Sequence, residues 1–185
     1  MNASRRGLLV ASLGLGGAAF SVGAASAASA RQINQDASQA LRQLYALHPK
    51  AREFGIKALA ILVFPKIYKA GFMVGGESGD GVLWVKGHTS GYYNLSAASF
   101  GLQAGAQRFS YALFFMTETA LKYLQSSNGW SIGSGPSVVV VDKGAAASVT
   151  STTLTHDVYA FPFGQQGLMA GLGLEGSKIT RIHPS

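Results

Sequence analysis

The segment Ala58–Gly87, which reads ALAILVFPKIYKAGFMVGGESGDGVLWVKG, constrains the fold more than any other part of the chain. It begins with the apolar run Leu59–Phe64, whose length and β-branched and aromatic content predict a strand. Five glycines follow between positions 71 and 81. Because only glycine adopts positive φ without a steric penalty, this density predicts tight turns or bulges between closely packed strands.

Three details of this segment carry more specific expectations. Pro65 cannot donate to a sheet ladder, so it should end the first strand or lie on its edge. Gly79-Asp80-Gly81 stands between two apolar runs, Phe72–Val74 and Val82–Val85, which predicts a hairpin with its turn at this tripeptide. Gly75 and Gly76 are expected at a turn or bulge with positive φ.

The segment Ile33–His48 predicts an amphipathic helix, because apolar residues recur at steps of three and four. Asn34 or Asp36 can cap its start, and Pro49 is suited to open a second, short helix. The expected role of the first helix is to cover one face of a sheet. The alternative is that it lies in a membrane interface, since basic residues flank its apolar stripe.

The remainder of the chain predicts mostly strands. Expected strands are Tyr92–Leu95, a loosely alternating run from Phe100 to Met116, Val158–Phe161, Leu168–Leu174 and Ile179–Ile182, with a helix at Thr117–Ser126 capped by Thr117. The four-valine run Val138–Val141 predicts a strand that is central or buried on both faces. There is no βαβ alternation, so we expect an α+β fold: a curved, mostly antiparallel, barrel-like β-sheet with an N-terminal amphipathic helix and one or two further helices.

Residues 1–30 have the pattern of a targeting segment. Arg5-Arg6 precedes a weakly apolar stretch, and Ala28-Ser29-Ala30 is a cleavage-type triplet. The arginine pair resembles a twin-arginine export signal, although the choice between the general and the twin-arginine export route stays open. We expect residues 1–30 to be a signal peptide, residues 31–185 to form a single domain, and the protein to be exported to the periplasm or cell envelope. An uncleaved membrane anchor is the alternative.

Composition fits an exported domain that is stabilised by its core alone. The chain has no cysteine, which excludes disulfides and thiolate chemistry, and 48% of its residues are hydrophobic against 12% charged. Positive charge is concentrated in residues 31–69, which hold seven Lys or Arg against Asp36 and Glu53. Such a cluster favours an anionic partner, although a solvated helix face explains it equally well. The candidate lipid-binding residues are Arg42, Lys50, Arg52, Lys57, Lys66 and Lys69.

Three motifs in order give the chain a family resemblance. They are Phe64-Pro65 with Lys69–Phe72 and Val74–Gly76, then Gly101–Gln107, then Gly167–Leu172 with Leu174–Gly176. Together they resemble the SYLF lipid-binding domain, over about residues 38–182. Eukaryotic members of that family bind phosphoinositides and, in some cases, actin, and bacterial members are exported proteins of poorly defined role. The resemblance therefore implies a single SYLF-like domain that binds lipid.

Other motifs give little support for catalysis. Gly129–Gly133 fits the Gly-x-Ser-x-Gly pattern around Ser131, but a hydrolase needs a strand before it and a helix after it, and here the predicted order is reversed. The four histidines share no metal-ligand spacing, and no basic-aromatic platform for nucleic acid is present. We therefore expect no enzyme activity, cofactor, metal ion or nucleic-acid partner. Gln103 and Gln107 share a predicted strand face and form a possible polar site, unless their amides only satisfy adjacent backbone.

The sequence thus predicts an exported, non-enzymatic lipid-binding protein that recognises anionic phospholipid headgroups at a membrane surface. The alternative is a structural or interaction protein of the cell envelope with a protein partner. The oligomeric state and the identity of the lipid stay open at this point.

Overall fold

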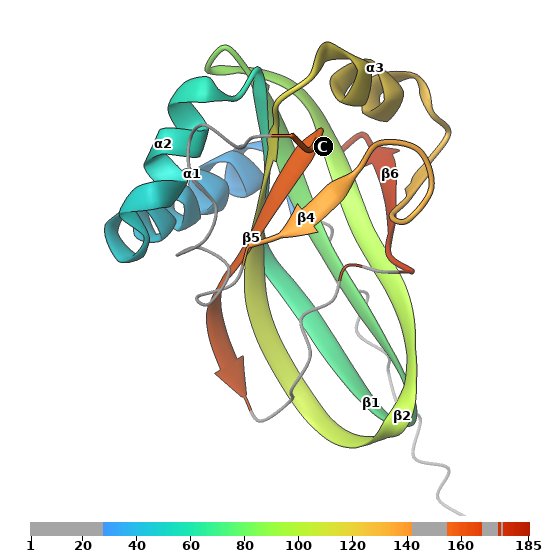
Figure 1. Ribbon diagram of the computed structural model, residues 1–185. Coiled ribbons are helices and arrows are strands. Elements are labelled where there is room, and N and C mark those ends of the chain that lie inside the picture. The colour runs from blue at the N-terminus through green and yellow to red at the C-terminus, as the bar shows by residue number, and fades with distance from the viewer. Residues whose placement is uncertain (1–27, 142–154, 168–173, 175) are drawn as a thin grey trace, which may run out of the picture.

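Figure 1 shows an α+β fold in which a long, curled β-ribbon is flanked by helices. The computed structural model describes residues 28–141, 155–167, 174 and 176–185, except for the side chains of 72–73, 99–104 and 167. The elements are α1 (Ala30–Leu47), α2 (Pro49–Lys57), β1 (Ala60–Val85), β2 (His88–Phe115), α3 (Glu118–Ser126), β3 (Trp130–Ser131), β4 (Val138–Val140), β5 (Val158–Gly167) and β6 (Lys178–Ile182). All strand pairs among these residues are antiparallel except β4 with β5. The predicted fold class is confirmed.

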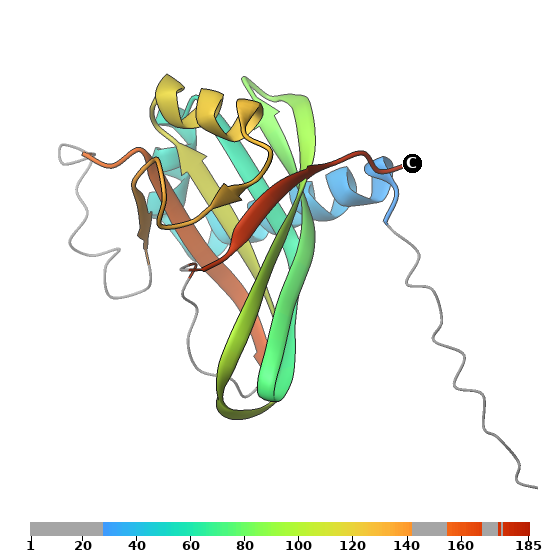
Figure 2. The same cartoon turned by 90° about the vertical axis from the view of Figure 1, so that its right-hand side faces the viewer.

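The strands β1 and β2 form one antiparallel ribbon that folds back on itself (Figures 1 and 2). The turn between them is at Lys86 and Gly87, which have φ of 51° and 81°. The predicted hairpin at Gly79-Asp80-Gly81 is therefore wrong, because this tripeptide lies inside β1. Its glycines serve a different purpose. A Cβ built on Gly81 would lie 2.5 Å from the carbonyl oxygen of Val63, so glycine permits the two halves of β1 to pack closely.

Two further expectations about β1 need correction. Pro65 does not end the strand but lies within it, where the pairing register shifts between Phe64 and Ile67 as in a β-bulge. Neither Gly75 nor Gly76 has positive φ. The bend of the ribbon therefore does not depend on a left-handed backbone at these two positions.

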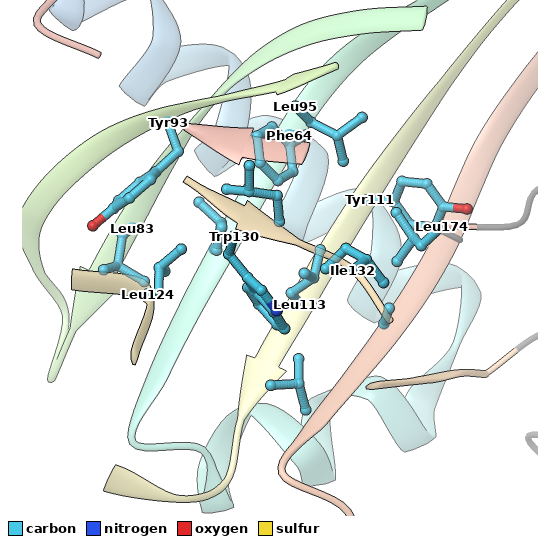
Figure 3. Packing of buried hydrophobic residues seen from close by; sticks show 14 of the residues in the cluster. Phe64, Leu83, Tyr93, Leu95, Tyr111, Leu113, Leu124, Trp130, Ile132 and Leu174 are labelled. Atoms are coloured by element: carbon cyan, nitrogen blue, oxygen red, sulfur yellow. The ribbon is translucent and has the colours of Figure 1, made fainter. Parts of the chain in front are cut away.

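Folding of the ribbon creates two layers with a core between them. One layer contains the first half of β1, the second half of β2, β5 and β4. The other layer contains the second half of β1, the first half of β2, β6 and β3. Alternate residues of each strand face inward, such as Leu62 and Phe64 in β1, and Figure 3 shows aromatic and aliphatic side chains meeting between the layers. Trp130 lies among them and donates from its indole nitrogen to the carbonyl of Ser134 at 2.9 Å. The interior is closed above by Ala120 and Leu124 of α3.

Helices α1 and α2 cover the outer face of the first layer, which confirms the expected packing of the N-terminal helix on the sheet. Their apolar residues meet outward-facing side chains such as Val63 and Phe114. Phe54 of α2 packs edge-on against Tyr159 and Phe161, with ring centroids 4.9 and 5.1 Å apart. The outer packing therefore forms a second hydrophobic core.

The helix caps match the sequence only in part. Thr117 caps α3 by accepting from the backbone N–H of Ala120 at 3.3 Å, as expected. Ser29 caps α1, rather than Asn34 or Asp36, and the backbone N–H of Ala30 donates to the carbonyl of Ser185 at 3.0 Å. This bond places the C-terminus beside the start of α1 (Figure 2).

One strand prediction fails, and two expected strands are confirmed as parts of a single longer strand. The valine run forms β4 at the edge of the sheet with half-buried side chains, because β4 pairs only with β5 among the described strands. Tyr92–Leu95 and the later run from Phe100 belong to one strand, β2. The strand expected at Leu168–Leu174 lies outside the described residues, apart from Leu174.

Candidate functional site: a cationic groove beside α1 and α2

The structure separates the six predicted lipid-binding residues into two groups. Lys66 forms an ion pair with Asp36, with 2.7 Å between its Nζ and a carboxylate oxygen. Desolvation by burial acts to raise the pKa of Asp36, but side-chain hydrogen bonds from Lys66 and Gln32 outweigh it and lower the pKa. Lys69 faces Glu77 at 3.8 Å, and only 13% of its side chain is exposed. Both amines are therefore directed at carboxylates of the protein itself. The role of the six residues in lipid binding stays a prediction.

The other four residues lie on the helices. Arg42 is exposed on α1, while Lys50, Arg52 and Lys57 lie on α2. The Arg52 guanidinium stands 5.8 Å from the ring centroid of Tyr45, a cation–π contact that joins the two helices. Arg42 lines the same groove as Tyr45, on which Arg52 stacks, so these two guanidinium groups stand on the flank of α1 away from the Asp36–Lys66 ion pair.

Exposed aliphatic side chains stand beside these cations. Ile56 of α2 is 80% exposed, Leu47 at the end of α1 is 57% exposed, and Leu59, which follows α2, is 36% exposed. A single exposed aliphatic residue needs no explanation, but Ile56 and Leu59 line the same groove as Arg42 and form an apolar edge next to positive charge. That combination is typical of surfaces that meet a lipid interface.

A groove of about 620 Å³ opens between α1, α2 and the start of β1. Its apolar walls are formed by Leu41, Tyr45, Ile56, Leu59, Ile61 and Trp84. Arg42 and Lys86 supply the charge in its lining, and Lys86 belongs to the β1–β2 turn. Sequence reasoning missed Lys86 because it placed the hairpin turn several residues too early. The Lys-Gly pair at 86–87 was the available signal for the correct turn.

Trp84 is held in place by a polar network at the wall of the groove. Its indole nitrogen donates to Asn34 Oδ1 at 3.2 Å, and Thr89 donates to the same oxygen at 3.0 Å. Asn34 Nδ2 in turn donates to the Tyr92 hydroxyl at 2.6 Å. Asn34, expected as a possible cap, therefore ties α1 to the sheet and fixes the indole.

The possible polar site at Gln103 and Gln107 is described only in part. Gln107 is 4% exposed, and its Oε1 has no hydrogen-bond partner in the described structure. The side chain of Gln103 lies outside the described residues, so the pairing of the two amides stays a prediction.

A buried carboxyl group lies between the two layers of the sheet. Desolvation by burial raises the pKa of Glu77, and Lys69 and the Ser177 hydroxyl, which donates at 3.3 Å, oppose the rise. Desolvation and the nearby Glu77 carboxylate raise the pKa of the Tyr111 hydroxyl. This cluster is distant in sequence from α1 and α2 and belongs to the inner core.

The described residues do not assemble the machinery of a hydrolase around Ser131. Ser131 lies in the two-residue strand β3, which follows α3, and its carbonyl accepts from Ser134. Within the described ranges, no three His, Cys, Asp or Glu side chains are grouped so that they could hold a metal ion. Nor does any helix in these ranges have the length and apolarity that a membrane span requires.

The fold and groove define a small α+β domain with a curled sheet and a cationic, partly apolar helical face. Residues 96–183 match the family model described as Ysc84, the Las17-binding protein actin regulator. The match confirms the SYLF resemblance over that segment. No curated protein matches the chain. The matched range contains most of β2 and everything from α3 to β6, whereas α1 and α2 lie outside it.

Proposed function

We propose that the protein binds anionic lipid headgroups reversibly at a membrane surface through the exposed face of α1 and α2. The observation that carries this proposal is the concentration of Arg42, Arg52 and Lys57 beside the exposed Ile56. Each basic residue near an anionic surface contributes roughly 1 kcal/mol, so this face supports reversible rather than permanent attachment. An apolar side chain that enters the interface adds to the charge attraction.

The test is sedimentation of the purified protein with phosphatidylglycerol vesicles and with neutral phosphatidylcholine vesicles. The variant Arg42→Glu, Arg52→Glu, Lys57→Glu should bind the anionic vesicles at least about a hundredfold more weakly. The matched control is Lys122→Glu, Lys178→Glu, Arg181→Glu, which changes the net charge equally at exposed positions on α3 and β6. It should keep affinity within a few-fold of the parent protein.

Salt gives an independent measurement of the same mechanism. Exposed charges are screened beyond a Debye length of about 8 Å at physiological ionic strength, so binding should weaken as salt rises. Equal binding to both vesicle types, or equal losses in the two triple variants, would contradict electrostatic recognition by this face. The better explanation would then be an envelope protein with a protein partner.

We also propose that the protein acts outside the cytoplasm, in the periplasm or at the cell envelope. The support is the arginine pair and small-residue triplet within residues 1–30, of which 1–27 lie outside the described residues. Fractionation of producing cells tests this location. Recovery of the full-length chain from the cytoplasm alone would contradict it.

A further inference from the structure

The groove beside α1 and α2 exists because small residues line it where the elements approach one another. Ser38 of α1, Gly55 and Ala58 at the end of α2, Ala60 of β1 and Gly87 of the turn all border the space. Larger side chains at these positions would fill it. Its volume of about 620 Å³ lies within the range of roughly 300–1,000 Å³ that is typical of small-molecule sites.

The lining of the groove combines apolar and cationic side chains. Leu59, Ile61 and Trp84 offer aliphatic and aromatic surface, and the indole of Trp84 is fixed through Asn34. Arg42 and Lys86 bring two cations from different elements, and the described lining contains no carboxylate to neutralise them. An occupant that suits this lining carries both a negative charge and an alkyl segment.

We propose that the groove holds one molecule of an anionic amphiphile, with its charged head between Arg42 and Lys86 and its alkyl chain along Trp84 and Leu59. This inference rests on the proposed lipid-binding function but goes further. Surface attraction needs only charge and a large membrane, whereas the groove selects a single molecule by both its head and its chain. A monomeric amphiphile should therefore bind at one to one without any vesicle.

The test uses lysophosphatidylglycerol with a twelve-carbon chain below its micelle concentration. Lysophosphatidylcholine of the same chain length lacks the net negative charge, and glycerol 3-phosphate lacks the chain. We expect one-to-one binding of the first by native mass spectrometry, with much weaker binding of the other two. Tight binding of glycerol 3-phosphate alone would show an anion site without a chain site and would overturn the proposal.

Fluorescence locates the bound molecule. The chain contains two tryptophans, and Trp130 lies in the inner core beneath α3, so a spectral change on binding should come from Trp84. The variant Trp84→Phe should lose the spectral change while mass spectrometry still detects the complex. Persistence of the change in that variant would place the ligand elsewhere.

Two positions on α1 provide matched variants. Ser38 lines the groove, whereas Gln43 borders a separate polar cleft on the other flank of the same helix. Ser38→Phe should fill the groove and reduce lysophosphatidylglycerol affinity at least about tenfold, while Gln43→Phe should change it less than about twofold. Equal affinities in the two variants would overturn the assignment.

Charge removal tests the head position separately. Arg42→Gln with Lys86→Gln should reduce the preference for lysophosphatidylglycerol over lysophosphatidylcholine by up to about thirtyfold, because an exposed ion pair contributes up to about 1 kcal/mol. An unchanged preference would contradict the placement of the head.

Vesicle sedimentation keeps the two proposals distinguishable. Ser38→Phe leaves Arg42, Arg52 and Lys57 in place, so it should still bind phosphatidylglycerol vesicles within a few-fold of the parent protein. If the parent protein binds vesicles but no monomeric amphiphile, the groove proposal fails and the surface proposal stands. If it binds neither, both fail.

Discussion

The self-folded β-ribbon makes a sharp prediction at Gly81. A Cβ at this position would lie 2.5 Å from the Val63 carbonyl oxygen and 2.6 Å from Cδ1 of Phe64, whereas ordinary contacts begin near 3.4 Å. The two halves of β1 would have to separate by nearly an ångström, and one of the opposing atoms belongs to the backbone. Overpacking of a filled core typically costs about 1–3 kcal/mol, and a backbone obstacle places Gly81→Ala at the upper end.

Thermal unfolding followed by circular dichroism measures this cost. For a domain of this size, 1 kcal/mol corresponds to roughly 2–4 °C in Tm, so Gly81→Ala should lower Tm by about 6–12 °C. Gly76→Ala is the matched control, because its Cβ would meet only the Ala97 carbonyl at 3.5 Å and its φ is not positive. The control should remain within a few degrees of the parent protein. Equal melting of the two variants would refute the close approach of the β1 halves.

Three further predictions concern pH, capping and processing. Burial raises the folded-state pKa of Glu77, so the folded protein binds this proton more tightly than the unfolded chain does. The free energy of unfolding should therefore fall as the pH rises from the unfolded-state pKa to the folded-state pKa of Glu77. Urea titrations at several mildly acidic pH values should show a smaller fall in the free energy of unfolding for Glu77→Gln than for the parent protein. The control Glu118→Gln, at an exposed position, should show the same fall as the parent protein. Ser29→Ala should lower stability by about 1 kcal/mol through loss of the α1 cap, as denaturant melts can measure. Because Ser29 caps α1, we expect cleavage after the earlier triplet Ala25-Ser26-Ala27 in place of the site after Ala30 that the triplet Ala28-Ser29-Ala30 predicts. Intact mass of the exported protein should show that Ser29 is retained, and a chain beginning at Arg31 would contradict this expectation.

The sequence predicts elements well where local periodicity and capping decide the structure. The stripe that includes Ile33, Ala37 and Leu44 is buried in α1, and Thr117 caps α3 through a bond that depends only on adjacent residues. Pro49 opens α2 because its missing N–H would have no helical partner at that position. In each case the deciding interactions lie within a few residues along the chain.

Prediction fails where two distant segments decide together. Glycines at 79 and 81 have the local signature of a turn, yet their partners are Lys66, Ile67, Val63 and Phe64 in the same long strand. The valine run at 138–140 has the composition of a central strand, but its place at the edge follows from which strands pair with β5. The candidate site shows the same limit: the cations could be counted from the sequence, but their partners could not.

The fold explains why a positive segment becomes a positive surface on only one side. Residues 31–69 carry an excess of cations, but Asp36 on one flank of α1 binds Lys66, and Glu77 lies against Lys69 between the layers. These carboxylates hold the lysines of β1, whereas the arginines of the helices remain at the surface. Arg42 shares the lining of the groove with Lys86, which lies outside the positive segment in the sequence. The positive charge in the groove is therefore set by the ribbon turn and the ion pairs. A charge count over residues 31–69 would include Lys66 and Lys69 and would omit Lys86.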